Sequence, residues 1–177
     1  MDAVILVFPY WNGIQARSLN SRVITSKRNI SKLEHLNSNS TIITTDNTLL
    51  IKESEIIILT LKPYTILPFL KEHASLFDTN KHTIVSCVTG ITLTEIQNVI
   101  GKTIGVYRAI PNTAASVNES ITAISSNIDL LNNEEEVSKV FKTLGVVVTI
   151  EESLMESATI LDACGVAFVL RFMRAMI

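Results

Sequence analysis

Two residues in the middle of this sequence, Asn112 and Thr113, have side chains suited to contact a bound ligand. They stand in the segment V-Y-R-A-I-P-N-T-A-A-S, which runs from Val106 to Ser116. The first residues favour a strand, and Pro111 disfavours helix at the residue before it. Ligands of open α/β sheets bind at the carboxyl ends of strands, so the amide and hydroxyl that follow are candidates for a pocket wall. An ordinary Asx turn is the commoner use of such residues, and the neighbouring segments must decide between the two.

Short β-branched runs alternate with helical patterns along the whole chain. The predicted strands are Val4–Phe8, Arg22–Thr25, Thr41–Thr45, Ile56–Leu61, Thr83–Val88, Thr103–Tyr107, Ile121–Ser125 and Val146–Ile150. The predicted helices are Lys32–Asn37, Thr48–Glu53, Thr65–Leu76, Leu93–Val99 and Asn133–Leu144. Thr92 and Asn132 are suited to N-cap positions, and Gly145 stands where a helix C-cap is expected.

The run E-I-I-I-L-T-L, from Glu55 to Leu61, does not alternate between apolar and polar residues. Continuous apolar strands of this kind belong to parallel sheets that are covered on both faces. Together with the alternation of strands and helices, this run predicts a doubly wound α/β domain with a parallel sheet over residues 1–150.

The last segment has a different pattern. From about Glu152 the chain is predicted to be helical, and from Leu161 onward apolar residues cover nearly every face of that helix. A helix that is apolar all round must be buried in a larger structure. The sequence also reaches Ile177 with no glycine or polar residue at the end of the helix to cap it, so we expect residues 151–177 to start a further helical domain. The alternative is a natural C-terminal helix docked on a second copy of the chain.

Composition excludes several classes of partner. Hydrophobic residues make up 47% of the chain and the formal net charge is −2, without a basic tail or stripe, so we expect no nucleic-acid or anionic-membrane binding. Cys87 and Cys164 match no metal or disulfide spacing and are expected to be buried free thiols, as in a reducing compartment. The N-terminus does not read as a signal peptide, and no uninterrupted apolar run reaches about 18 residues. These features predict a cytoplasmic protein without a metal site.

Six segments in a fixed order carry a family resemblance. They are T-S-K-R-N after the second strand, T-D-N at 45–47, L-T-L-K-P at 59–63, S-C-V-T-G-I at 86–91, the V-Y-R-A-I-P-N-T segment, and E-E-S-L-M-E-S-A-T-I-L-D-A-C-G-V-A-F at 151–168. As an ordered set they resemble pyrroline-5-carboxylate reductase, the NAD(P)H-dependent enzyme that makes proline. The resemblance covers residues 22–177. It implies a Rossmann-like NAD(P)-binding domain followed by the start of an all-helical dimerisation domain.

The resemblance also implies roles for individual residues. The implied cofactor-binding residues are Ser26, Arg28, Asn47, Thr60, Leu61, Lys62, Pro63, Cys87, Val88, Thr89 and Asn112. The implied substrate pocket consists of Asn112, Thr113 and, as a substrate-side acid, Glu152. A guanidinium such as that of Arg28 can bind a ribose 2′-phosphate with two hydrogen bonds, which favours NADPH, with NAD as the alternative nucleotide. Taken singly, each of these residues has a commoner structural use.

The N-terminus departs from the family pattern. A strand followed by a glycine-rich turn is expected there, because backbone N–H groups hold the pyrophosphate in such turns. Here Pro9-Tyr10-Trp11-Asn12-Gly13 supplies one glycine, and the eight residues from Ile14 to Ser21 are too few for a crossover. The first βα unit is therefore expected to be atypical.

The last segment departs as well, and its departures leave other functions open. D-A-C-G-V-A-F stands at 162–168 where the family has S-G-S-G-P-A-Y. Hydride transfer in this family depends mainly on positioning, so we expect no catalytic acid in the chain. The prediction is a partial pyrroline-5-carboxylate reductase that reduces 1-pyrroline-5-carboxylate to L-proline and forms homo-oligomers through C-terminal helices. The alternatives are a non-catalytic Rossmann-like binding module and another NADP-dependent reductase, such as one acting on hydroxy acids.

Overall fold

The computed structural model describes residues 4–6, 23–26, 41–101, 103–127 and 134–177. These residues form one sheet with the strand order β3-β2-β1-β4-β5-β6-β7-β8. The strands are β1 (Val4–Leu6), β2 (Val23–Ser26), β3 (Thr41–Thr44), β4 (Ile56–Leu59), β5 (Thr83–Ser86), β6 (Gly105–Pro111), β7 (Ser120–Ser126) and β8 (Gly145–Thr149). Every predicted strand is present, with ends that differ by up to four residues.

Seven strand pairs form this sheet, and one of them corrects the prediction of a parallel sheet. β7 runs antiparallel to β6, whereas the other neighbouring strands are parallel. Only the short segment 112–119 joins the two strands, and a parallel crossover needs a dozen residues or more. The pairing with β7 also explains why β6 continues to Pro111 and does not end at Tyr107 as predicted, since both residues lie in the paired register.

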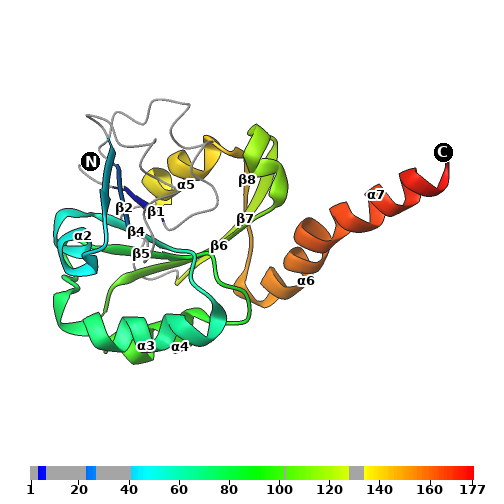
Figure 1. The fold of residues 1–177 in the computed structure, drawn as a ribbon. Helices are drawn as coiled ribbons and strands as arrows, with labels where there is room; N and C mark the ends of the chain where they lie inside the picture. Colours follow the sequence, from blue (N-terminus) through cyan, green and yellow to red (C-terminus); the bar gives the residue numbers. More distant parts are fainter. Residues whose placement is uncertain (1–3, 7–22, 27–40, 102, 128–133) are drawn as a thin grey trace.

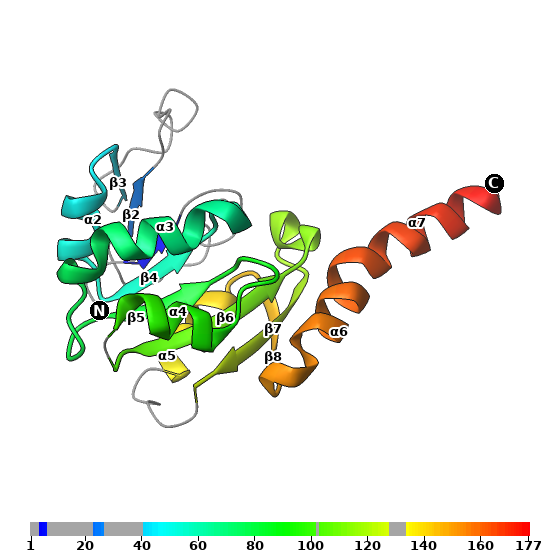
Figure 2. The ribbon, with the colours of Figure 1, turned by 90° about the horizontal axis from the view of Figure 1, so that it is seen from below.

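Helices cover both faces of the sheet, as the continuous apolar strand predicted (Figures 1 and 2). On one face α2 (Asn47–Glu53), α3 (Pro63–His73, continued by η2, Ala74–Leu76) and α4 (Leu93–Ile100) bury Ile51, Ile66 and Ile96 against Ile57 of β4. On the other face α5 (Glu134–Lys142) packs against Ile58. β4 is buried along its whole length, so the doubly wound α/β fold is confirmed.

The predicted helix ends are partly confirmed. Thr92 caps α4 in a reciprocal capping box: its hydroxyl accepts the Glu95 N–H, and the Glu95 carboxylate accepts the Thr92 N–H. The prediction for Gly145 is wrong, because α5 ends earlier and Gly145 is the first residue of β8, at φ +144°. The predictions for 32–37, for Asn132 and for residues 9–21 lie outside the described residues.

The C-terminal segment is helical, as predicted, and extends away from the α/β body (Figures 1 and 2). It comprises η5 (Glu152–Leu154), α6 (Met155–Thr159), the π-helical turn η6 (Ile160–Cys164) and α7 (Gly165–Ala175). Met155 packs against Ile110 and Ala123 and is fully buried, whereas Phe168 and Phe172 of α7 are 71% and 66% exposed. Within this chain, therefore, the apolar stretch from Leu161 onward is largely exposed, and burial is confined to the turns before it.

The same segment has one further property. Among the described residues, the helix Glu152–Ala175 is long and apolar enough to cross a membrane by length and composition, with a mean hydropathy of 1.5. The sequence predicted no membrane span because no uninterrupted apolar run is long enough. This helix reaches its length with Asp162, Arg171 and Arg174 included, and these residues interrupt its apolar run. Its first turns are also packed against the sheet, which ties the segment to the α/β body.

Candidate functional site

The strand order reverses between β1 and β4, and this reversal marks the expected binding crevice. In β3-β2-β1-β4-β5 the chain winds outward in both directions from the β1–β4 pair. Open α/β sheets bind ligands outside the carboxyl ends of the strands at such a point. Most of the predicted cofactor-binding residues stand at or just beyond the carboxyl ends of β2, β4, β5 and β6, so the fold brings them to one edge of the sheet.

Ser26 and Asn47, which are 21 positions apart, are in direct contact at this edge. The Ser26 hydroxyl donates a hydrogen bond of 2.7 Å to Oδ1 of Asn47. Ser26 is the last residue of β2, and Asn47 begins α2, whose N-cap Asp46 accepts the N–H groups of Thr48 and Leu49. Because Asn47 accepts through its oxygen, its amide N–H groups are not used by this contact and can donate to a ligand. Arg28 lies outside the described residues.

The segment after β4 runs directly into α3. Thr60 and Leu61 are half-buried, whereas Lys62 and Pro63 are exposed. Lys62 is the N-cap residue but its side chain makes no capping hydrogen bond, and Pro63 opens the helix, where its missing N–H costs nothing. This helix start therefore offers a positive dipole end and an adjacent lysine, both favourable to a bound anion.

The segment after β5 is more rigidly held. The Cys87 N–H donates to the Leu59 carbonyl at 2.8 Å, and the Val88 N–H donates to the Ser86 hydroxyl at 3.2 Å. Burial raises the pKa of the Cys87 thiol to about 12, so at neutral pH it is a protonated wall residue. Thr89 is exposed and is the side chain of this segment that is free to contact a ligand.

Asn112 forms the predicted Asx-type turn and also makes a long-range contact. Its Oδ1 accepts the Ala114 N–H at 3.1 Å and caps the 3₁₀ turn η3 (Thr113–Val117). Its Nδ2 donates to Oδ1 of Asp162, in η6, at 2.7 Å. Asn112 can therefore form an Asx turn and also belong to a pocket wall, because the turn uses its oxygen and leaves its amide nitrogen to contact other groups. Thr113 is exposed.

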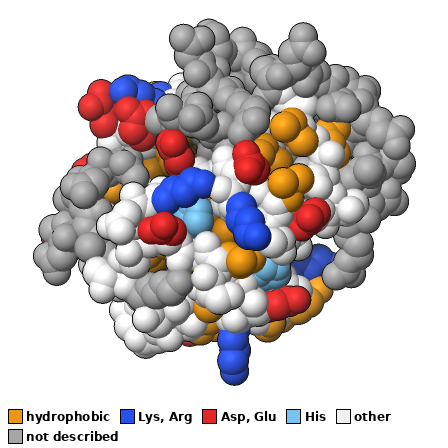
Figure 3. Space-filling model, turned by 90° about the vertical axis from the view of Figure 1, so that its left-hand side faces the viewer, with side chains coloured by type: hydrophobic (Ala, Val, Ile, Leu, Met, Phe, Trp, Pro, Cys, Tyr) orange, Lys and Arg blue, Asp and Glu red, His pale blue; other side chains and the backbone are white. Residues whose placement is uncertain are grey.

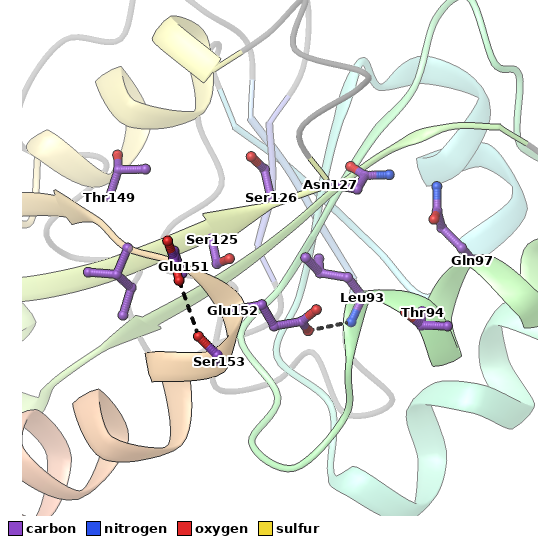
Figure 4. A pocket seen from close by; sticks show the side chains of 11 residues that line it. Leu93, Thr94, Gln97, Ser125, Ser126, Asn127, Thr149, Glu151, Glu152 and Ser153 are labelled. Atoms are coloured by element: carbon purple, nitrogen blue, oxygen red, sulfur yellow. Dashed lines mark hydrogen bonds between the residues drawn. The ribbon is translucent and has the colours of Figure 1, made fainter.

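Glu152 lines a cavity of about 660 Å³ between α4, the ends of β7 and β8, and η5 (Figure 4). The cavity lies beside the carboxyl end of β5, because Leu93 begins the helix after β5 and Arg108 is paired with Ser86, the last residue of that strand. Oε1 of Glu152 accepts the backbone N–H of Leu93 at 2.7 Å and a guanidinium N–H of Arg108 at 3.1 Å. Arg108 is only 4% exposed. The carboxylate predicted to face the substrate is thus bound to two other elements of the chain, and its predicted role remains a prediction.

Asp162 is not among the predicted site residues, although its place in the sequence is unusual. It stands where the family pattern has serine, in the D-A-C-G-V-A-F segment. It lines a second cavity, of about 310 Å³, whose other lining residues are apolar: Ile121, Ala123, Val148, Ile150, Ala158 and Leu161. Its Oδ2 is buried, without a hydrogen-bond partner among the described residues. Desolvation raises the pKa of this carboxyl, and the hydrogen bond from Asn112 partly opposes the rise.

Comparison with known proteins agrees with the motifs. Residues 11–90 match the family described as NADP oxidoreductase coenzyme F420-dependent. Two relatives from Dictyostelium discoideum, pyrroline-5-carboxylate reductase 1 and pyrroline-5-carboxylate reductase 2, are 30% and 31% identical over 171 and 172 aligned residues. Each alignment covers 88% of this chain, but the chain spans only 30% of the first relative and 57% of the second.

Solved structures share the fold. A pyrroline-5-carboxylate reductase from Coxiella burnetii superposes with a TM-score of 0.87 at 21% identity, over 98% of this chain and 67% of the other. The Plasmodium falciparum pyrroline carboxylate reductase, solved with NADP bound, gives a TM-score of 0.81 at 18% identity, over 98% and 66%. In sequence and in fold, the chain is similar to the pyrroline-5-carboxylate reductases over most of its length, as its ordered motifs predicted.

Proposed function

We propose that this chain is the cofactor-binding part of a pyrroline-5-carboxylate reductase, which reduces 1-pyrroline-5-carboxylate to L-proline with NADPH. The observation that carries the proposal is the convergence of the motif residues on one edge of the sheet. Residues 26, 47, 60–63, 87–89 and 112, which are scattered over the sequence, follow the ends of β2, β4, β5 and β6 or begin the adjoining helix. The named relatives and the shared fold support the same assignment.

The residues at this edge are chemically suited to a dinucleotide. Ser26 and Asn47 form a polar pair suited to a ribose, and Lys62 stands beside a helix start that favours phosphate. The wall formed by Cys87 and Val88 is apolar and neutral, which suits a nicotinamide ring. A bound nicotinamide cofactor would supply hydride to the substrate carbon, while the chain's own residues would orient the imine and exclude water.

The same proposal covers the partners of the protein. The apolar side chains of α7, among them Phe168, Leu170 and Phe172, are suited to burial against the helix of a second copy. On the side of the molecule shown in Figure 3, acidic and basic side chains alternate and no patch of one sign stands out among the described residues. With a net charge of −2, this distribution supports a cytoplasmic enzyme of small-molecule metabolism.

The test has two steps. First, the purified chain is titrated with NADPH and with NADH while cofactor fluorescence is followed; we expect binding of NADPH. Second, NADPH oxidation is measured with pyrroline-5-carboxylate, and NADP⁺ reduction with a panel of hydroxy acids. Imine-dependent oxidation supports the proposal. Failure to bind either nucleotide would favour a non-catalytic module, and activity confined to hydroxy acids would favour another reductase.

A further inference from the structure

We propose that Asp162 is a catalytic residue of this chain, which holds the nitrogen of a cyclic imine and supplies the proton that accompanies reduction. This inference rests on the proposed function and adds a residue to it, in place of the prediction that the chain has no catalytic acid. The juxtaposition that supports it is the contact between Asp162 and Asn112, at the carboxyl end of β6. This contact joins the predicted pocket wall to the C-terminal helix.

The two oxygens of Asp162 have different surroundings. Oδ1 accepts the Asn112 amide at 2.7 Å, which fixes the orientation of the carboxyl group. Oδ2 is screened from solvent and has no hydrogen-bond partner within the part of the chain that the structure describes. A buried carboxyl oxygen without a partner is costly, so such an atom calls for a ligand or a proton. Asp162 itself lines the second cavity, so a ligand bound there lies beside its carboxyl group.

The cavity beside Asp162 matches a small cyclic imine. Its six other lining residues are apolar, and its volume of about 310 Å³ is ample for a five-membered ring. The ring methylenes would pack against side chains such as Val148 and Ile150. Asp162, the one titratable group among the described lining residues, would meet the ring nitrogen. The π-helical turn that carries Asp162 is a local irregularity of a kind that is frequent at functional sites.

The proton balance follows from this arrangement. When hydride reaches the imine carbon, the C=N π electrons move to nitrogen, and nitrogen takes the proton from Oδ2. The product is the ring amine and Asp162 is left as a carboxylate, which solvent reprotonates for the next turnover. A neutral acid also avoids repulsion with the carboxylate that pyrroline-5-carboxylate carries next to its nitrogen. Desolvation of Asp162 favours that neutral form, since Asn112 is uncharged and the cavity wall is apolar.

The variant Asp162→Asn isolates the proposed role. An asparagine keeps the carbonyl oxygen that accepts from Asn112 and changes only the second oxygen, so the fold contact is retained. Glu156→Gln is the matched control, because it removes an exposed carboxylate from the same helix. Both variants and the unchanged chain are compared in NADPH titration, so that cofactor binding is measured separately from the role of Asp162.

Imine binding without turnover provides the decisive measurement. With NADP⁺ present, pyrroline-5-carboxylate cannot be reduced, and its binding is followed by calorimetry. Because an asparagine N–H can still donate to the ring nitrogen, binding is tested with Asp162→Leu, which has no donor and is also titrated with NADPH. We expect Asp162→Leu to weaken imine binding about tenfold or more and Glu156→Gln to leave it unchanged. In turnover, kcat/KM of the unchanged chain should fall as pH rises through the pKa of Asp162, and Asp162→Asn should lower it about 10²-fold and abolish that fall.

The possible failures are distinguishable. If the chain binds NADPH and the imine but Asp162→Leu binds the imine as tightly as Glu156→Gln does, the role of Asp162 is overturned and the proposed function stands. If the chain binds NADPH but no imine, both the proposed substrate and the role of Asp162 are overturned.

Discussion

The Arg108 guanidinium donates a hydrogen bond of 3.1 Å to Oε1 of Glu152. The same oxygen accepts a hydrogen bond of 2.7 Å from the backbone N–H of Leu93, the first residue of α4. One side chain thus joins the start of the C-terminal helix to β6 and to the helix that follows the Cys87–Thr89 segment. Arg108 is almost fully buried, so this carboxylate is its neutralising partner. Glu152, to which the family resemblance assigned a role in substrate binding, therefore makes a contact that holds the fold together.

Removal of this carboxylate should destabilise the fold. Glu152→Ala leaves the Arg108 guanidinium buried without its partner, and we expect the free energy of unfolding to fall by about 2–3 kcal/mol. Urea denaturation followed by circular dichroism measures the change. The neighbouring Glu151→Ala is the control and should change stability by less than about 0.5 kcal/mol, because Glu151 is exposed. Equal effects of the two substitutions would show that the Arg108 contact contributes nothing.

The contact between Ser26 and Asn47 should contribute to nucleotide binding. Ser26→Ala removes the hydroxyl that orients the Asn47 amide, so we expect NADPH to bind about five- to tenfold more weakly, which corresponds to about 1 kcal/mol. The measurement is the fluorescence titration described above, with thermal unfolding run in parallel to confirm that the variant is folded. Thr45→Ala, an exposed hydroxyl just before α2, is the control, and it should bind NADPH as the unchanged chain does.

Two glycines should respond in opposite ways to the same substitution. At Gly145 the backbone has φ +144°, and an added Cβ would lie 2.1 Å from the Ser120 carbonyl oxygen, so Gly145→Ala should cost about 3 kcal/mol or more. At Gly165, which is in helix α7, nothing lies within 4 Å of an added Cβ. Gly165→Ala should therefore be neutral or stabilise by up to about 1 kcal/mol. Thermal or urea unfolding of both variants checks the prediction, and a tolerated Gly145→Ala would contradict the close approach of β7 and β8.

The two cysteines should differ in reactivity. The pKa of Cys87 is raised to about 12 by burial, so near pH 8 only about one thiol in 10⁴ is ionised, and thiolate is the reactive species. Cys164 is exposed. Iodoacetamide labelling followed by mass spectrometry should modify Cys164 in the folded chain and Cys87 only after denaturation. Rapid labelling of Cys87 under native conditions would show that the wall beside the proposed nicotinamide site is open.

The sequence by itself determined the architecture and the family resemblance. The unbroken apolar run at 56–59 specified a strand covered on both faces, and the β-branched runs specified the other strands, because periodicity and burial are local properties. The Thr92 cap with Glu95 was readable for the same reason, since both partners lie within one helical turn. The ordered motifs led to the pyrroline-5-carboxylate reductases without any structural information.

Only the tertiary structure decided which side chains meet. The contacts of Asn112 with Asp162, of Arg108 with Glu152 and of Ser26 with Asn47 span 50, 44 and 21 positions, and no local pattern encodes them. The antiparallel pairing of β7 with β6 and the positive φ of Gly145 likewise depend on how neighbouring strands pack. The residue types indicate which chemical groups the chain contains. The fold determines which of these groups are buried next to one another. For that reason Glu152 is bound to Arg108, whereas Asp162 meets Asn112.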